Sequence, residues 1–150
     1  MRGIFLSIGS NLGEREHSLR EAQVLLGKAG VSVRRESAMY ECEPWGDRDQ
    51  PWFLNQCVEV ETTLEPEELL ALIKKVEKEI GRVDGEKWGP RAIDIDILLY
   101  GSQTVDTEEL SIPHREMTKR KFVLVPLSEL LPVDSFLDDC QDRSVVRKIG

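Results

Sequence analysis

The sequence predicts an α+β fold built on the βαββαβ order of ferredoxin-like domains. Four segments, at residues 3–8, 31–41, 52–62 and 93–100, have the apolar or alternating composition of strands. Two further segments, 14–29 and the stretch that begins at Pro66, repeat apolar residues at helical spacing. Read in chain order, these six segments give strand, helix, strand, strand, helix, strand, which is the split βαβ arrangement.

Each element has its own local support. The first strand runs into a turn-like Gly-Ser-Asn-Leu-Gly sequence at 9–13, and the first helix follows with apolar residues at Leu19, Ala22, Leu25, Leu26 and Ala29. In the third strand, alternation places one set of side chains on one face, Leu54, Val58 and Val60, and another set on the opposite face, Phe53, Asn55, Cys57, Glu59 and Glu61.

The second helix begins at Pro66, a favoured first helical residue, and ends at Gly81. Its apolar stripe is formed by Leu69, Leu72, Ile73, Val76 and Ile80. After the fourth strand, we expect a short helix over residues 119–131, whereas the tail has no informative pattern.

Length and composition indicate a single soluble domain over residues 1–150. The chain is 40% hydrophobic and 32% charged, with a net charge of −8 and a pI near 4.9, so we expect no nucleic-acid and no membrane partner. The N-terminus has no signal-peptide pattern and no segment is apolar enough to span a bilayer, which favours a cytoplasmic protein with its three cysteines reduced. A monomer is expected, because no exposed apolar stripe calls for a partner.

The pair Asp94 and Asp96 is the strongest chemical feature. On a strand both carboxylates project to one face, with Cα atoms roughly 6.5 Å apart, while Ile93, Ile95 and Ile97 point into the core. Two adjacent carboxylates repel each other unless a cation or solvent separates them, and Mg²⁺ takes one or two carboxylates together with phosphate oxygens. The alternative is the solvent-exposed face of an ordinary amphipathic strand.

Arg91 precedes this pair by three residues, after a rigid Trp-Gly-Pro turn that begins at Trp88. A guanidinium beside a carboxylate pair suits phosphoryl transfer, in which metal ions bridge phosphates and fixed cations hold the developing charge. A salt bridge between Arg91 and Asp94 would explain the arginine equally well at this stage. The basic segment 114–121 could likewise be a solvated surface.

Phe53 and Asn55 form a second candidate site, because they share the strand face opposite the aliphatic residues. An aromatic ring offers a stacking surface, and an amide offers donors and an acceptor to the edge of a flat heterocycle. His114 could donate to a phosphate, exchange a proton or cap a turn. Core packing and a structural amide remain the alternatives for Phe53 and Asn55.

These motifs together resemble the 6-hydroxymethyl-7,8-dihydropterin pyrophosphokinase family of folate biosynthesis. The resemblance extends from about residue 4 to 131 in family order. Its segments are Gly9-Ser10-Asn11-Leu12, Pro44 to Gly46, Gln50-Pro51 with Phe53-Leu54-Asn55, Gly81-Arg82-Val83, Trp88 through Asp96, Pro113-His114, and Arg120 with Phe122.

The resemblance implies a mainly antiparallel sheet with helices packed on both sides, and transfer of the β,γ-diphosphate of ATP to a reduced pterin with release of AMP. It implies two Mg²⁺ ions on Asp94 and Asp96, with Arg82 and Arg91 as the catalytic cations. The pterin would be bound by Cys42, Glu43, Pro44, Trp45, Phe53, Asn55 and Phe122. ATP would be bound by Trp88, Ser111, His114, Arg115 and Arg120.

Two other classes compete with this interpretation. A non-catalytic ferredoxin-like module that binds a small molecule would leave the aspartates as a plain strand face, without Mg²⁺-dependent nucleotide binding. An Asp-x-Asp nucleotide-sugar transferase would share the carboxylate pattern, but the chain is short for its donor domain.

Overall fold

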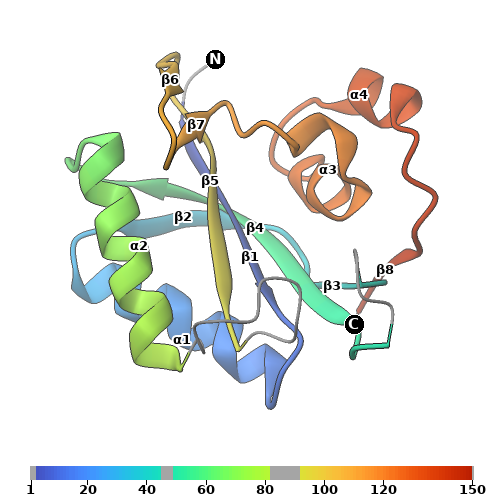
Figure 1. Ribbon diagram of the computed structural model, residues 1–150, viewed down its shortest axis with the longest axis horizontal. Helices are drawn as coiled ribbons and strands as arrows, with labels where there is room; N and C mark the ends of the chain where they lie inside the picture. Colours follow the sequence, from blue (N-terminus) through green and yellow to red (C-terminus); the bar gives the residue numbers. More distant parts are fainter. Residues whose placement is uncertain (1–2, 45–48, 82–91, 150) are drawn as a thin grey trace.

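The computed structural model describes residues 3–44, 49–81 and 92–149. A six-stranded antiparallel sheet lies at its centre (Figure 1), in the order β5-β1-β4-β3-β8 with β2 also paired to β4. Its strands are β1 (Ile4–Ser10), β2 (Ser32–Glu36), β3 (Tyr40–Cys42), β4 (Phe53–Glu61), β5 (Asp94–Tyr100) and β8 (Val146–Lys148). A separate two-stranded sheet pairs β6 (Val105–Asp106) with β7 (Ser111–Ile112).

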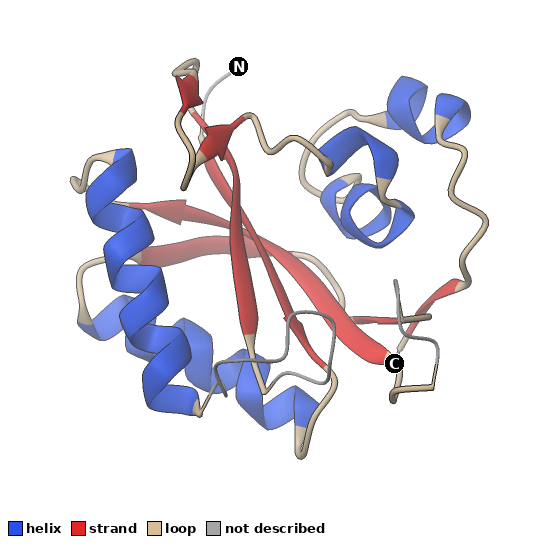
Figure 2. Ribbon diagram, viewed as in Figure 1, coloured by secondary structure: helices blue, strands red, loops and turns tan. Residues whose placement is uncertain are grey.

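Helices pack on both faces of the main sheet (Figure 2), which confirms the predicted α+β class. Helices α1 (Arg15–Lys28) and α2 (Pro66–Ile80) cover one face, and α3 (Lys121–Leu127) covers the other, with α4 (Asp134–Asp139) packed on α3. None of the helices in the described ranges is long and apolar enough to cross a membrane.

Alternation along the strands divides the core between these two faces. Leu6, Ile8, Leu54, Val58 and Ile95 pack toward α1 and α2, as the period of two in the sequence predicts. On the α3 face, the buried residues are Phe5, Cys57, Leu98, Leu99, Met117, Val123, Leu124, Leu127, Val133 and Cys140. A register shift between Phe5 and Leu6 allows both Leu98 and Leu99 to join that second cluster.

Helix α2 begins and ends where the sequence predicts. Glu65 and Glu68 form a reciprocal capping box around the first turn, and Pro66 needs no hydrogen-bond acceptor there. Gly81 ends the helix in the left-handed conformation with φ 109°, which a side chain would disfavour.

Two expected elements differ from the structure. The predicted strand at 31–41 is divided into β2 and β3, because the register shifts between Val33 and Arg35 and the Ala38 N–H turns away to the Glu129 carboxylate (N···O 3.0 Å). The predicted helix at 119–131 is a 3₁₀ turn over Met117–Lys119 followed by α3, since Arg120 between them has extended dihedrals. The tail, which showed no pattern, forms α4 and the edge strand β8.

Candidate functional site

Three strands bring the principal predicted residues into one row across the sheet. Asp94 on β5 pairs with Gly9 on β1, and Gly9 pairs with Asn55 on β4. Neighbouring strands lie about 4.8 Å apart, so Asp94 and Asn55 are separated by roughly 10 Å. The row therefore places a carboxylate and an amide at a distance that one small substrate could bridge.

The carboxylate pair lies on β5, an edge strand of the main sheet. Ile93, Ile95 and Ile97 are 0–4% exposed, whereas the side chain of Asp96 is 43% exposed, which confirms the predicted division of faces. The Nε2 atom of His114 lies 3.9 Å from an Asp96 carboxylate oxygen. The aspartates thus project from the face opposite α1 and α2, toward the segment that precedes α3.

His114 is held by its own loop in a defined tautomer. The backbone N–H of His114 donates to the Leu98 carbonyl oxygen (3.0 Å). The ring Nδ1 atom accepts from the backbone N–H of Glu116 (3.1 Å). Burial, followed by the positive charge of Arg120, lowers the pKa of His114. In the neutral ring the proton is therefore on Nε2, the nitrogen nearest Asp96.

Asn55 occupies a space that only a glycine at position 9 leaves open. A Cβ built on Gly9 would stand 2.3 Å from the Asn55 Oδ1 atom and 3.6 Å from Phe53 Cδ1. Asn55 is 5% exposed and also hydrogen-bonds the Cys42 thiol. Burial raises the pKa of Cys42 to about 12, so this thiol is a neutral, unreactive neighbour of the amide.

Phe122 lies in the first turn of α3, on the same side of the sheet. It is half-buried against the second core cluster, and the guanidinium carbon of Arg120 lies 5.7 Å from its ring centroid. Two aromatic residues predicted to stack on a ligand, Phe53 and Phe122, thus belong to different elements that meet on the α3 face.

The remaining predicted residues divide into three groups. Ser111 donates to the Pro113 carbonyl oxygen (3.2 Å), and Arg115 forms an exposed ion pair with Asp106 (3.1 Å), so both are engaged near the β6–β7 hairpin. Cys42 and Pro44 are buried, and Glu43 contacts Val145. Four predictions fall outside the described residues: Trp45, Arg82, Trp88 and Arg91.

Glu77 is a site-forming residue that the sequence analysis missed. It is 3% exposed in α2, and its carboxylate accepts the N–H of Ile95 (2.9 Å), the residue between the two aspartates. Its position four residues after Ile73 places it beside the apolar stripe, which was the available signal. Glu77 thus ties α2 to the backbone of β5 between Asp94 and Asp96.

Asn11 belongs to one of the segments that carry the family resemblance, but its role in the site was not predicted. Its amide donates to the Gln50 side chain (2.7 Å) and to the Pro51 carbonyl oxygen (2.9 Å). These bonds tie the end of β1 to the segment that leads into β4, so they fix Phe53 and Asn55 relative to Gly9.

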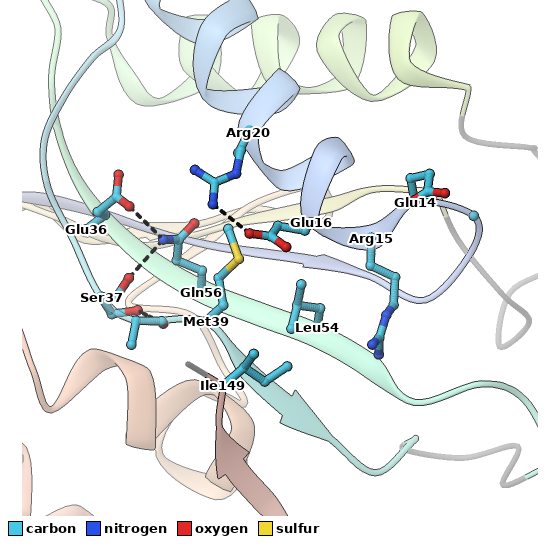
Figure 3. A pocket seen from close by; sticks show the side chains of 12 residues that line it. Glu14, Arg15, Glu16, Arg20, Glu36, Ser37, Met39, Leu54, Gln56 and Ile149 are labelled. Atoms are coloured by element: carbon cyan, nitrogen blue, oxygen red, sulfur yellow. Dashed lines mark hydrogen bonds and ion pairs between the residues drawn. The ribbon is translucent and has the colours of Figure 1, made fainter.

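A cavity of about 640 Å³ lies elsewhere, on the side of the sheet that α1 covers (Figure 3). Its polar walls satisfy one another: Arg20 pairs with Glu16, and Gln56 donates to Glu36 and to the Ser37 carbonyl oxygen. No predicted site residue lines this cavity. Its size alone therefore does not make it the functional site.

The donor chemistry of the row fits magnesium better than zinc or iron. Over the described residues, no group of three His, Cys, Asp or Glu side chains converges as a metal cage. Magnesium does not need one, because it combines one or two carboxylates with water and substrate phosphate oxygens. Asp94 and Asp96 provide that number of ligands on one accessible face.

The fold and the site together define an α+β protein of the ferredoxin-like type that carries a carboxylate pair on one face of an edge strand. Residues 5–132 match the sequence model of the family described as 7,8-dihydro-6-hydroxymethylpterin-pyrophosphokinase (HPPK), and the chain belongs to that family.

Curated relatives agree with this assignment. The chain is 46% identical over 127 residues to a protein of Bacillus subtilis and 44% identical over 133 residues to one of Methylorubrum extorquens, both named 2-amino-4-hydroxy-6-hydroxymethyldihydropteridine pyrophosphokinase. The matches cover 84% and 88% of this chain, and 76% and 84% of those proteins.

Longer proteins carry the same domain. A pea protein named "Folate synthesis bifunctional protein, mitochondrial" is 44% identical over 85% of this chain, which spans only 25% of its length. The solved structure "HPPK-DHPS in complex with substrates" has a TM-score of 0.66 at 14% identity, and covers 93% of this chain and 43% of that chain. That likeness shows the fold.

Proposed function

We propose that this chain transfers the β,γ-diphosphate of ATP to the hydroxymethyl oxygen of 6-hydroxymethyl-7,8-dihydropterin, giving AMP and the pterin diphosphate in folate biosynthesis. The row that runs from Asp94 through Gly9 to Asn55 carries the proposal. In this row the Asp94 carboxylate would bind metal and the Asn55 amide would bind the edge of the pterin, and their separation of roughly 10 Å supports binding of one small substrate between them. Family membership supplies the substrates.

Asp94 and Asp96 would hold two Mg²⁺ ions. When bound, the ions would offset the charge of the ATP phosphates during in-line attack. The two half-exposed carboxylates fit this role, because both project from one strand face and lie beside a neutral His114. A protonated histidine at that place would compete with the cation.

Cationic residues would bind the phosphates. Arg82 and Arg91 would hold them through paired hydrogen bonds and stabilise the transition-state charge. His114 and Arg120 would contact ATP from the α3 side. Three further ATP contacts are assigned to Trp88, Ser111 and Arg115, and the last would exchange its Asp106 ion pair for a phosphate.

The pterin would lie between Phe53 and Phe122, with its edge read by Asn55. The absence of a side chain at Gly9 leaves room for this buried amide, and its hydrogen bond with the Cys42 thiol supports one orientation, which would favour binding of a flat ligand. The segment Cys42-Glu43-Pro44-Trp45 would complete the pocket wall.

We further propose that residues 1–150 form one pyrophosphokinase domain that acts as a cytoplasmic monomer. Its net charge of −8 supports the absence of a nucleic-acid or anionic-membrane partner. Size-exclusion chromatography with light scattering tests the oligomeric state, and a dimer mass would contradict it.

Product analysis of the purified chain with ATP, Mg²⁺ and 6-hydroxymethyl-7,8-dihydropterin tests the activity. We expect AMP and diphosphorylated pterin in equal amounts, and no product after chelation of the metal. ADP formation would refute diphosphate transfer. Pterin binding without any turnover would favour the non-catalytic module instead.

A further inference from the structure

The C-terminal segment Cys140–Ile149 lies beyond the residues that the family model matches. It nevertheless contacts both sides of the proposed pterin slot, which is the space between Phe122 at the start of α3 and the wall formed by Cys42 and Glu43. After α4 this segment runs beside α3 and ends as β8 at the sheet edge (Figure 1). It begins at Cys140, which is buried in the same core cluster as α3. The segment is therefore anchored at the helix and at the sheet.

The sheet contact fixes the wall formed by Cys42 and Glu43. Val146 pairs with Cys42 across the β3–β8 ladder. Next to that pair, the Glu43 N–H donates to the Val145 carbonyl oxygen (3.1 Å), and the Glu43 side chain accepts the Val145 N–H (2.5 Å). These bonds hold the backbone at the base of the loop that follows Cys42.

The helix contact fixes the opposite wall, through Asp142. One carboxylate oxygen accepts the N–H of Lys121 (3.0 Å), the first residue of α3 and the neighbour of Phe122. The other oxygen accepts the N–H of Ser144 (2.9 Å) and also the Ser144 hydroxyl. One side chain thus joins the start of α3 to the turn that leads into β8.

We propose that Asp142 is a positioning residue for the pterin slot, holding Phe122 at a fixed position relative to the Cys42–Glu43 wall. The inference rests on the proposed function, because it needs Phe122 to stack on the pterin. Loss of the carboxylate frees the Lys121 N–H and the turn at Ser144 together. The start of α3 then moves independently of β3, and the slot loses its fixed width.

The selective effect distinguishes this role from a general structural one. The hydrogen bonds of Asp142 reach the pterin walls, whereas Asp94 and Asp96 stand on β5 at the other edge of the sheet. Loss of the Asp142 bonds should therefore raise the Michaelis constant for the pterin more than that for ATP, which shares only Arg120 with the start of α3. A purely structural residue would lower the active fraction, and so kcat, without changing either constant.

The experiment measures both Michaelis constants, kcat and the thermal midpoint for the full chain and for Asp142→Ala, Asp142→Asn and Asp138→Ala. Asp138 is an exposed acid of α4 and controls for the lost charge. We expect Asp142→Ala to raise the pterin constant about three- to tenfold, the size of a lost helix-capping bond. Asp142→Asn should be intermediate, since one amide oxygen replaces two acceptors, and Asp138→Ala should match the unsubstituted chain.

A folded Asp142→Ala variant with a pterin constant within twofold of the unsubstituted chain would overturn the inference, as would equal rises for ATP and pterin. If Asp142→Ala does not fold, the Michaelis constants of Asp142→Asn for the pterin and for ATP are compared with those of the unsubstituted chain in the same way. An unsubstituted chain that forms no AMP would refute the proposed function, and the inference with it. Normal turnover with an unselective Asp142 effect would refute the inference alone.

Discussion

Replacing Gly9 with alanine should damage pterin binding through Asn55 alone. Gly9 lies within β1 and is not among the glycines with positive φ, so its backbone accepts alanine. The added Cβ would nevertheless stand 2.3 Å from the Asn55 Oδ1 atom. Ordinary contact needs roughly 3.4 Å, so that oxygen must move by about 1 Å.

A displacement of this size is expected to weaken pterin binding by about 10- to 100-fold, because the amide no longer meets the heterocycle edge. ATP binding should be unchanged, because the atoms nearest the added Cβ belong to Asn55 and Phe53 and to no proposed ATP-binding residue. Titration calorimetry with the pterin and a non-hydrolysable ATP analogue measures both affinities. Gly27→Ala is the matched control, since a Cβ at that helical position contacts nothing within 4 Å.

A double-mutant cycle tests the cause. In an Asn55→Ala background, Gly9→Ala should add little further loss, because the displaced group is already absent. Full additivity of the two penalties would refute the steric argument. Unchanged pterin affinity in Gly9→Ala would refute the role of Asn55 in reading the pterin edge.

Three further predictions concern the carboxylates and buried charges. Asp94→Ala should abolish AMP formation with little change in the thermal midpoint, since one of two repelling charges is lost; activity retained with Mg²⁺ would exclude the metal role. Glu77→Ala should lower the free energy of unfolding in urea by about 1–3 kcal/mol, because it leaves a buried backbone N–H of β5 unsatisfied. The control Glu79→Ala, at an exposed position of the same helix, should leave the free energy of unfolding unchanged. Burial, followed by the hydrogen bond and charge of Glu129, raises the pKa of Tyr40 to about 12. The folded chain therefore keeps this proton where the unfolded chain loses it, so the stabilisation is complete below pH 10 and decreases as the pH rises toward 12. Absorbance titration at 295 nm should show Tyr40 ionising at lower pH in Glu129→Gln; identical titration curves would contradict the assignment.

The faces of β4 and β5 were predictable because a strand has a period of two. Leu54 and Val58 lie toward α1 and α2, and Asn55 lies toward α3, as alternation requires. The carboxylate face of β5 followed in the same way from its buried isoleucines. The row across three strands was not predictable from spacing, because register depends on long-range pairing.

The missed features share one physical cause, which is pairing with distant segments. Glu77 is an acidic residue within a helix, and its acceptor role for Ile95 depends on where β5 docks. The interruption of the predicted strand at 31–41 depends on Glu129, a residue 91 positions from Ala38. The partner in each contact could therefore not be identified from the local sequence alone.

The pairing of β1 with both β4 and β5 has a consequence for synthesis on the ribosome. A nascent chain that has emerged through α2 already contains Gly9 and Asn55, but neither carboxylate. The aspartates join the row only when β5 docks on β1, more than 80 residues along the chain from its partner strand. Such a non-local closure is slow compared with helix formation. The row of Asp94, Gly9 and Asn55 is therefore complete only after β5 has docked on β1, and Phe122 on α3 is synthesised later still.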